Sequence, residues 1–105
     1  MPARYTYVWE FQVLPGNEAL FAHHYGAAGS WAKLFRRAPG YVETLLLKDP
    51  ATPGRYVTVD RWENAAAFES FRARFGRAYE ELDRRCAALT VDERSLGAFE
   101  EIGPG

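Results

Sequence analysis

Asp60 and Trp62 occupy alternate positions of the segment 55–62, whose β-branched and aromatic residues favour a strand. Alternate residues of a strand share one face, so the Asp60 carboxyl is expected beside aromatic rings. Burial there would raise the pKa of the carboxyl and let it accept a proton near neutral pH. We therefore predict Asp60 as a candidate catalytic base. The alternative is a structural ion pair, since Arg55 and Arg61 lie in the same segment.

His24 is the second candidate base. It lies on the apolar side of a predicted helix, together with Leu20 and Trp31, and the reference pKa of histidine is near 6.5. The neighbouring His23 lies about 100° further around a helix, so the two imidazoles cannot chelate one metal from one face. The alternative for His24 is a packed imidazole without chemistry.

Aromatic residues recur at every second position from Tyr5 to Phe11, including Tyr7 and Trp9. Trp9 and Trp62 both belong to the aromatic side of their strands. A buried indole N–H needs a hydrogen-bond acceptor, so two tryptophans on one sheet face suggest a cavity with a polar guest. These residues predict an aromatic pocket wall, with plain core packing as the alternative.

Composition excludes several other kinds of site and partner. A net charge of −1 gives no basic surplus for nucleic acid. The single cysteine, Cys86, excludes an internal disulfide and a cysteine-rich metal site, so no metal is expected. The chain contains no apolar run as long as a membrane span, about 20 residues, and its first residues lack a signal-peptide pattern. We expect a cytoplasmic protein with neither nucleic-acid nor membrane partners.

Proline–glycine pairs at residues 15–16, 39–40 and 53–54 predict turns that divide the chain. Between them, hydrophobic periodicity predicts strands and helices in alternation. The expected strands are residues 4–13, 41–48, 55–62 and 96–102, with a turn at 90–93. The expected helices are residues 17–38, bent near Gly29, and 64–89, bent near Gly76.

The order is β-α-β-β-α-β, which predicts an α+β, ferredoxin-like single domain over residues 1–105. Its four-stranded antiparallel sheet would carry both helices on one face. The other face would then expose apolar side chains, and a second copy of the sheet is the simplest cover. We therefore expect a homodimer.

Several motifs resemble the antibiotic biosynthesis monooxygenase family: residues 8–16, 29–31, 39–41 and 56–64, followed by Ala67-Phe68 and Phe71. Trp62 at the strand end, followed by Glu63-Asn64, is the most specific of them. The resemblance covers roughly residues 7–99. It implies the dimeric α+β barrel fold, in agreement with the order of elements.

One branch of that family consists of cofactor-free monooxygenases that oxidise polycyclic phenols to quinones. The resemblance places their pocket tryptophan at Trp62 and their strand asparagine at Thr58, which has a hydroxyl in place of the amide. The substrate-binding residues expected around a pocket between helices and sheet are Tyr7, Trp9, Trp31, Thr58, Phe71, Phe75 and Tyr79, and the catalytic candidates are His24, Asp60 and Trp62.

A second branch degrades haem with an asparagine on the first strand and a histidine on the second helix. Here those features correspond to Trp9 and to a helix without histidine, where Tyr79 is the nearest candidate ligand. We expect a monooxygenase of small or polycyclic aromatic compounds that uses no cofactor. A haem-degrading enzyme, a non-catalytic dimeric protein that binds a small hydrophobic ligand, and a lyase or isomerase stay open as alternatives.

Overall fold

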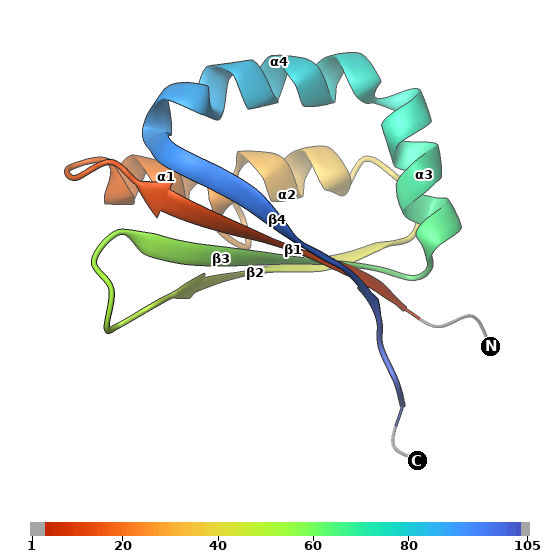
Figure 1. The fold of residues 1–105 in the computed structure, drawn as a ribbon. Helices are drawn as coiled ribbons and strands as arrows, with labels where there is room; N and C mark the ends of the chain where they lie inside the picture. Colours follow the sequence, from red (N-terminus) through yellow and green to blue (C-terminus); the bar gives the residue numbers. More distant parts are fainter. Residues whose placement is uncertain (1–3, 104–105) are drawn as a thin grey trace.

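The computed structural model describes residues 4–103. Four strands form one antiparallel sheet in the order β2-β3-β1-β4, and all helices lie on the same face of it (Figure 1). The strands are β1 (Tyr5–Val13), β2 (Tyr41–Lys48), β3 (Arg55–Trp62) and β4 (Thr90–Glu100). The helices are α1 (Glu18–Tyr25), α2 (Ser30–Phe35), α3 (Ala65–Arg74), α4 (Gly76–Cys86) and the short η1 (Ala87–Leu89). This confirms the predicted ferredoxin-like α+β fold.

Each of the two expected helices is a pair of helices. A Cβ at Gly29 would lie 2.5 Å from the carbonyl oxygen of His23, so this glycine allows the tight connection between α1 and α2. The second break falls at Phe75, directly before Gly76, where the backbone leaves the helical region. Asn64 caps α3, because its Oδ1 accepts a hydrogen bond of 2.8 Å from the backbone N–H of Ala67. The breaks let both pairs curve over the sheet.

Strand β4 begins earlier than expected. The turn predicted at residues 90–93 and the strand start predicted at Leu96 are both wrong, because β4 pairs with β1 from Thr90 onward. It is an edge strand, and most of its side chains are exposed. Without a buried face its sequence has little alternation, which is the feature that strand prediction needs.

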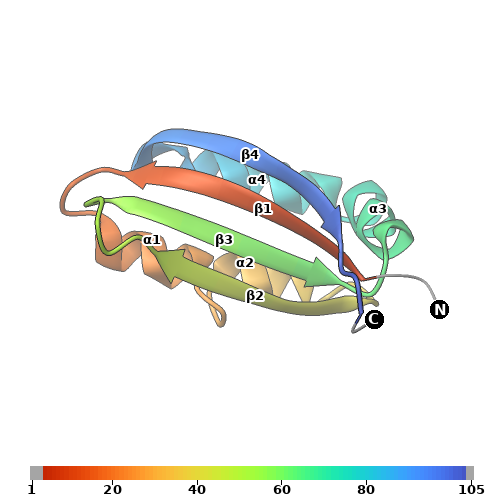
Figure 2. The ribbon, with the colours of Figure 1, turned by 60° about the horizontal axis from the view of Figure 1, so that its bottom comes forward.

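The sheet has one covered and one open face. The rings of Phe11 and Tyr56 point toward the helices and are buried in the core. The face turned away from the helices lies uncovered in Figure 2. The strand register places Leu45 opposite Val59 and Leu47 opposite Val57 on this open face, and both leucines are exposed.

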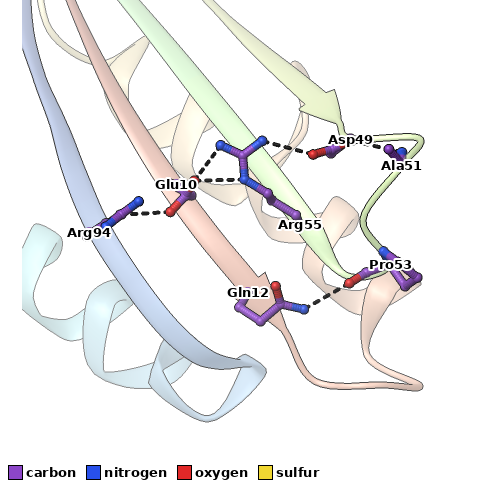
Figure 3. A network of polar contacts seen from close by, with 7 residues as sticks. All are labelled: Glu10, Gln12, Asp49, Ala51, Pro53, Arg55 and Arg94. Carbon is purple, nitrogen blue, oxygen red and sulfur yellow. Dashed lines mark hydrogen bonds and ion pairs between the residues drawn. The ribbon is translucent and has the colours of Figure 1, made fainter.

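An ionic network occupies one end of the open face (Figure 3). Glu10 on β1 accepts hydrogen bonds of 2.8 Å from Nε of both Arg55 and Arg94, which come from the two flanking strands. Asp49 contacts the other side of the Arg55 guanidinium at 2.9 Å. These contacts tie β4, β1 and β3 together.

Candidate active site

A cavity of about 100 Å³ lies between the covered sheet face and the helices. Its wall is mostly aromatic, with two threonines and three carboxyl groups. The lining residues are Tyr7, Trp9, Phe11, Tyr25, Trp31, Phe35, Thr44, Thr58, Asp60, Tyr79, Asp83 and Glu93. All four strands and three helices, α1, α2 and α4, contribute.

Asp60 supplies a buried acid to this cavity. Only 6% of the residue is exposed, and burial raises the pKa of its carboxyl to about 7. The Thr44 hydroxyl donates a hydrogen bond of 2.7 Å to Asp60 Oδ1, which partly opposes that rise. Near neutral pH the carboxyl therefore exchanges readily between its charged and neutral forms.

The ion pair considered for Asp60 does not form. Arg55 and Arg61 alternate with Asp60 and point to the open face of the sheet. There Arg55 pairs with Glu10 and Asp49, and Arg61 pairs with Glu43 and Glu101. The charge of Asp60 is thus left without a cationic partner among residues 4–103.

A chain of hydroxyl groups leads from Asp60 toward the surface. Because the Thr44 hydroxyl donates to Asp60, the Tyr41 hydroxyl is the donor in its 2.7 Å contact with Thr44 Oγ1. Tyr41 is partly exposed. The two hydroxyls hold the carboxyl in one orientation and connect it to a partly exposed side chain outside the cavity lining.

Most of the expected binding residues do line the cavity. Tyr7, Trp9 and Thr58 approach it from the sheet, and Trp31 and Tyr79 approach it from α2 and α4. Burial and, to a smaller extent, the nearby Asp60 raise the pKa of the Tyr7 phenol. The structure thus brings together the aromatic wall and the acid that the strand periodicity predicted.

Trp62 lies in the core and not in the cavity wall. Its side chain is fully buried, with ring centroids 5.3 Å from Phe71 and 5.7 Å from Phe35. Phe71 is likewise buried in the core, while Phe75 is half-buried beneath the Arg37 guanidinium, 5.0 Å from its ring centroid. Trp62 and Phe71 pack behind Phe35 of the cavity wall, and Phe75 packs against Phe71.

His24 is also outside the cavity lining. Its Nδ1 lies 2.8 Å from the Ser30 hydroxyl, a contact that joins α1 to α2. Partial burial, and then the nearby His23 and Arg85, lower the pKa of the imidazole. His24 is placed to stabilise the helix connection and is not one of the residues that line the cavity with Asp60.

Six lining residues were not predicted: Phe11, Tyr25, Phe35, Thr44, Asp83 and Glu93. Phe11 continues the aromatic alternation of β1, so its position was available from the sequence. Thr44 reaches Asp60 only because the β2–β3 register sets the two residues opposite each other. The places of Asp83 and Glu93 in the lining depend on how α4 packs above β4. The sequence has no periodic pattern that predicts this packing.

The arrangement offers one buried carboxyl, that of Asp60, inside an aromatic, partly enclosed cavity. Among residues 4–103, no group of three or more His, Cys, Asp or Glu side chains converges closely enough to hold a metal ion. None of the helices described is long and apolar enough to cross a membrane. The chemistry that these residues support by themselves is the removal of a proton from an aromatic ligand.

Comparison with known proteins gives a consistent family match. The sequence model described as antibiotic biosynthesis monooxygenase matches residues 4–81. No protein of curated function matches the chain. Solved structures, in contrast, match it over nearly its full length.

One of these is SnoaB from Streptomyces nogalater, described as a cofactor-independent oxygenase. It is 25% identical, with a TM-score of 0.72, over 97% of this chain and 96% of its own. A variant of the same enzyme gives a TM-score of 0.74 over the same shares. A candidate antibiotic biosynthesis monooxygenase from Bordetella bronchiseptica is 20% identical, with a TM-score of 0.73, over 95% of this chain and 98% of its own, and supports the fold.

Proposed function

The chain belongs to the antibiotic biosynthesis monooxygenase family, and from this we propose that it is a monooxygenase that oxidises a small aromatic substrate without a cofactor. The observation that carries the proposal is the buried Asp60 carboxyl, unpaired by any cation, in an aromatic cavity. The similarity of the chain to SnoaB, a cofactor-independent oxygenase, supports the same reaction class.

In the proposed reaction Asp60 acts as the base. Its carboxylate removes a proton from an acidic CH₂ or from a phenolic or enolic O–H of the substrate, leaving an electron-rich anion. That anion forms a C–O bond with O₂ to give a peroxide anion, which takes the proton back from Asp60. Loss of water from the resulting hydroperoxide leaves a carbonyl group at the same carbon. The aromatic wall excludes water from the anion while it reacts.

The cavity limits the part of the substrate that it can enclose. An engineered protein cavity of about 150 Å³ holds one benzene molecule, and the cavity here measures about 100 Å³. We propose that about one reactive ring is enclosed next to Asp60. Any further rings would lie at the opening, near the exposed Asp83.

The residues of the cavity do not fit haem. A porphyrin has four pyrrole rings and needs several times the enclosed volume. Tyr79, the expected ligand, has a pKa raised by burial, although Arg72 partly opposes the rise, whereas a tyrosinate ligand needs a lowered pKa. We therefore derive no step through haem.

We further propose that the protein is a homodimer formed through the open sheet face. Exposed leucines, Leu45 and Leu47, and the exposed Phe99 lie on this face, beside half-buried valines. Apolar side chains gathered on one face favour burial against a second copy. The helix-covered cavity would remain accessible in such a dimer.

Oxygen consumption tests the proposed reaction. Purified protein with a metal chelator is given a panel of phenols, naphthols and anthrones, and oxygen uptake is compared with protein-free buffer. The proposal predicts uptake with at least one compound and a quinone as product. Binding of these compounds with no uptake would contradict it and would favour the non-catalytic ligand-binding alternative.

A further inference from the structure

The cavity combines aromatic walls with an unusual balance of charge. Seven of its twelve lining residues are aromatic and three are acidic, and none is Lys, Arg or His. Two of the acids, Asp83 on α4 and Glu93 on β4, are exposed and therefore lie where the cavity opens to solvent. Asp60 is buried at its inner end.

The three acids of the cavity lack the arginine partners that four acids on the other side of the sheet have. Glu10, Glu43, Asp49 and Glu101 all pair with arginines. Within residues 4–103, Asp60, Asp83 and Glu93 form no ion pair. Burial and the neighbouring Asp83 and Asp92 raise the pKa of Glu93, as expected where carboxylates repel one another without a counter-ion.

The aromatic walls add to the negative potential. The faces of aromatic rings carry partial negative charge and attract cations, most strongly when the site is desolvated. The Arg72 guanidinium lies 4.1 Å from the centroid of the Tyr79 ring. Arg72 is exposed and does not line the cavity, so no basic side chain belongs to the cavity wall.

One lining residue, Trp31, also has a buried indole donor without an acceptor. The Trp31 residue is 7% exposed, and its Nε1–H lies near the Tyr25 hydroxyl and the Cys86 thiol without a hydrogen bond of good geometry to either. An unpaired buried donor costs free energy until an acceptor reaches it. A ligand hydroxyl or carbonyl could supply that acceptor.

We infer that the ligand of this cavity is an aromatic compound that carries both an oxygen substituent and a protonated amine, and that its carboxylate counterpart is rejected. The ammonium group would lie at the opening between Asp83 and Glu93, with the ring against the Trp9 and Trp31 walls. An organic cation fits better than a metal ion, since the acids of the described chain do not converge into a metal site. The inference refines the proposed function, because it takes the same cavity as the substrate site.

The test compares three probes of one skeleton by isothermal titration calorimetry at about pH 8, where the amine is protonated: tyramine, the neutral alcohol tyrosol, and 4-hydroxyphenylacetate. We expect tyramine to bind roughly tenfold more tightly than tyrosol, since a cation over aromatic rings and near carboxylates gains about 1.4 kcal/mol or more. The carboxylate should bind most weakly. Equal affinities, tightest binding of the carboxylate, or no binding by any probe would overturn the inference.

A matched pair of variants locates the charge preference. The double variant Asp83→Asn, Glu93→Gln should lower the tyramine affinity to that of tyrosol. The control Glu80→Gln, Glu81→Gln removes the same charge from exposed positions of α4 outside this cavity and should leave the preference intact. An equal loss of tyramine affinity in both double variants would show only an effect of net charge. It would contradict an ammonium site between Asp83 and Glu93.

The outcomes separate this inference from the proposed function. Binding in the predicted order, without oxygen uptake by the protein on any phenol, would support the charge preference and contradict the proposed monooxygenase activity. Oxidation of phenols together with equal affinity for all three probes would support the monooxygenase and contradict the charge preference.

Discussion

The Thr44 hydroxyl donates a hydrogen bond of 2.7 Å to Oδ1 of the buried Asp60 carboxyl, and the two residues face each other across the β2–β3 pairing. The bond favours the charged carboxylate, whereas burial favours the neutral acid. In the proposed reaction, Thr44 is therefore a positioning residue that sets the pH range in which Asp60 would act as a base.

Replacing Thr44 tests this relationship. In Thr44→Val the hydrogen bond is lost, so the pKa of Asp60 should rise and activity should need a higher pH. The pH of half-maximal kcat should increase by roughly one unit, since a hydrogen bond to a charged group contributes about 1.5 kcal/mol. Thr44→Ser keeps the hydroxyl and should restore the wild-type profile. An unchanged pH profile in the valine variant would exclude this role for Thr44.

Asp60 should also affect stability in a direction that depends on pH. Its pKa is raised from 3.8 to about 7 in the folded protein, so the folded state binds more protons than the unfolded chain between these values. The free energy of unfolding should therefore decrease as the pH rises from about 4 to about 7, by about 1.4 kcal/mol for each unit that separates the two pKa values.

In Asp60→Asn that decrease should be absent, and the variant should be more stable than wild type at about pH 8. Urea unfolding monitored by circular dichroism at several pH values measures the difference between the two proteins. Parallel stability curves for wild type and variant would show that the carboxyl is not the group that titrates.

His24 should be dispensable for the reaction. It does not line the cavity, and its imidazole contacts Ser30 instead. In His24→Ala, kcat/KM should stay within about twofold of wild type, with only a modest decrease in thermal stability. A loss of tenfold or more in kcat/KM, in a variant with an unchanged circular dichroism spectrum, would show that His24 takes part in the reaction.

Part of the site could be predicted from the sequence because strand alternation fixes which side chains share a face. That rule placed Tyr7, Trp9, Thr58 and Asp60 together. It could not say how far along the strand the cavity extends, so Trp62, on the correct face, lies in the core under Phe71.

Helix positions were harder to predict than sheet positions. The apolar stripes of both helical pairs contain core and cavity residues with the same spacing, and only packing separates Trp31 from His24. The edge strand β4 lacks alternation, which concealed both its start and the place of Glu93. The predicted order of elements is correct despite these errors, because the Pro–Gly turns divide the chain clearly.

The proposed dimer can be separated by substitutions on the open sheet face. Leu45→Glu, Leu47→Glu places two charges among the apolar side chains of that face and should give a monomer in size-exclusion chromatography with light scattering. The control Leu14→Glu, Leu20→Glu changes leucines of similar exposure, 37% and 50% against 40% and 49%, outside that face, and should remain a dimer. A wild-type protein that is already monomeric would contradict the proposal.

The most direct test of the central claim is oxygen uptake by wild type and Asp60→Asn with the best phenolic substrate, in the presence of a metal chelator. The wild-type rate should rise with pH through about 7, following ionisation of Asp60. The asparagine variant, which keeps the side-chain shape, should bind the substrate with similar affinity yet consume oxygen only at the protein-free rate. Wild-type turnover in Asp60→Asn would contradict the assignment of Asp60 as the base.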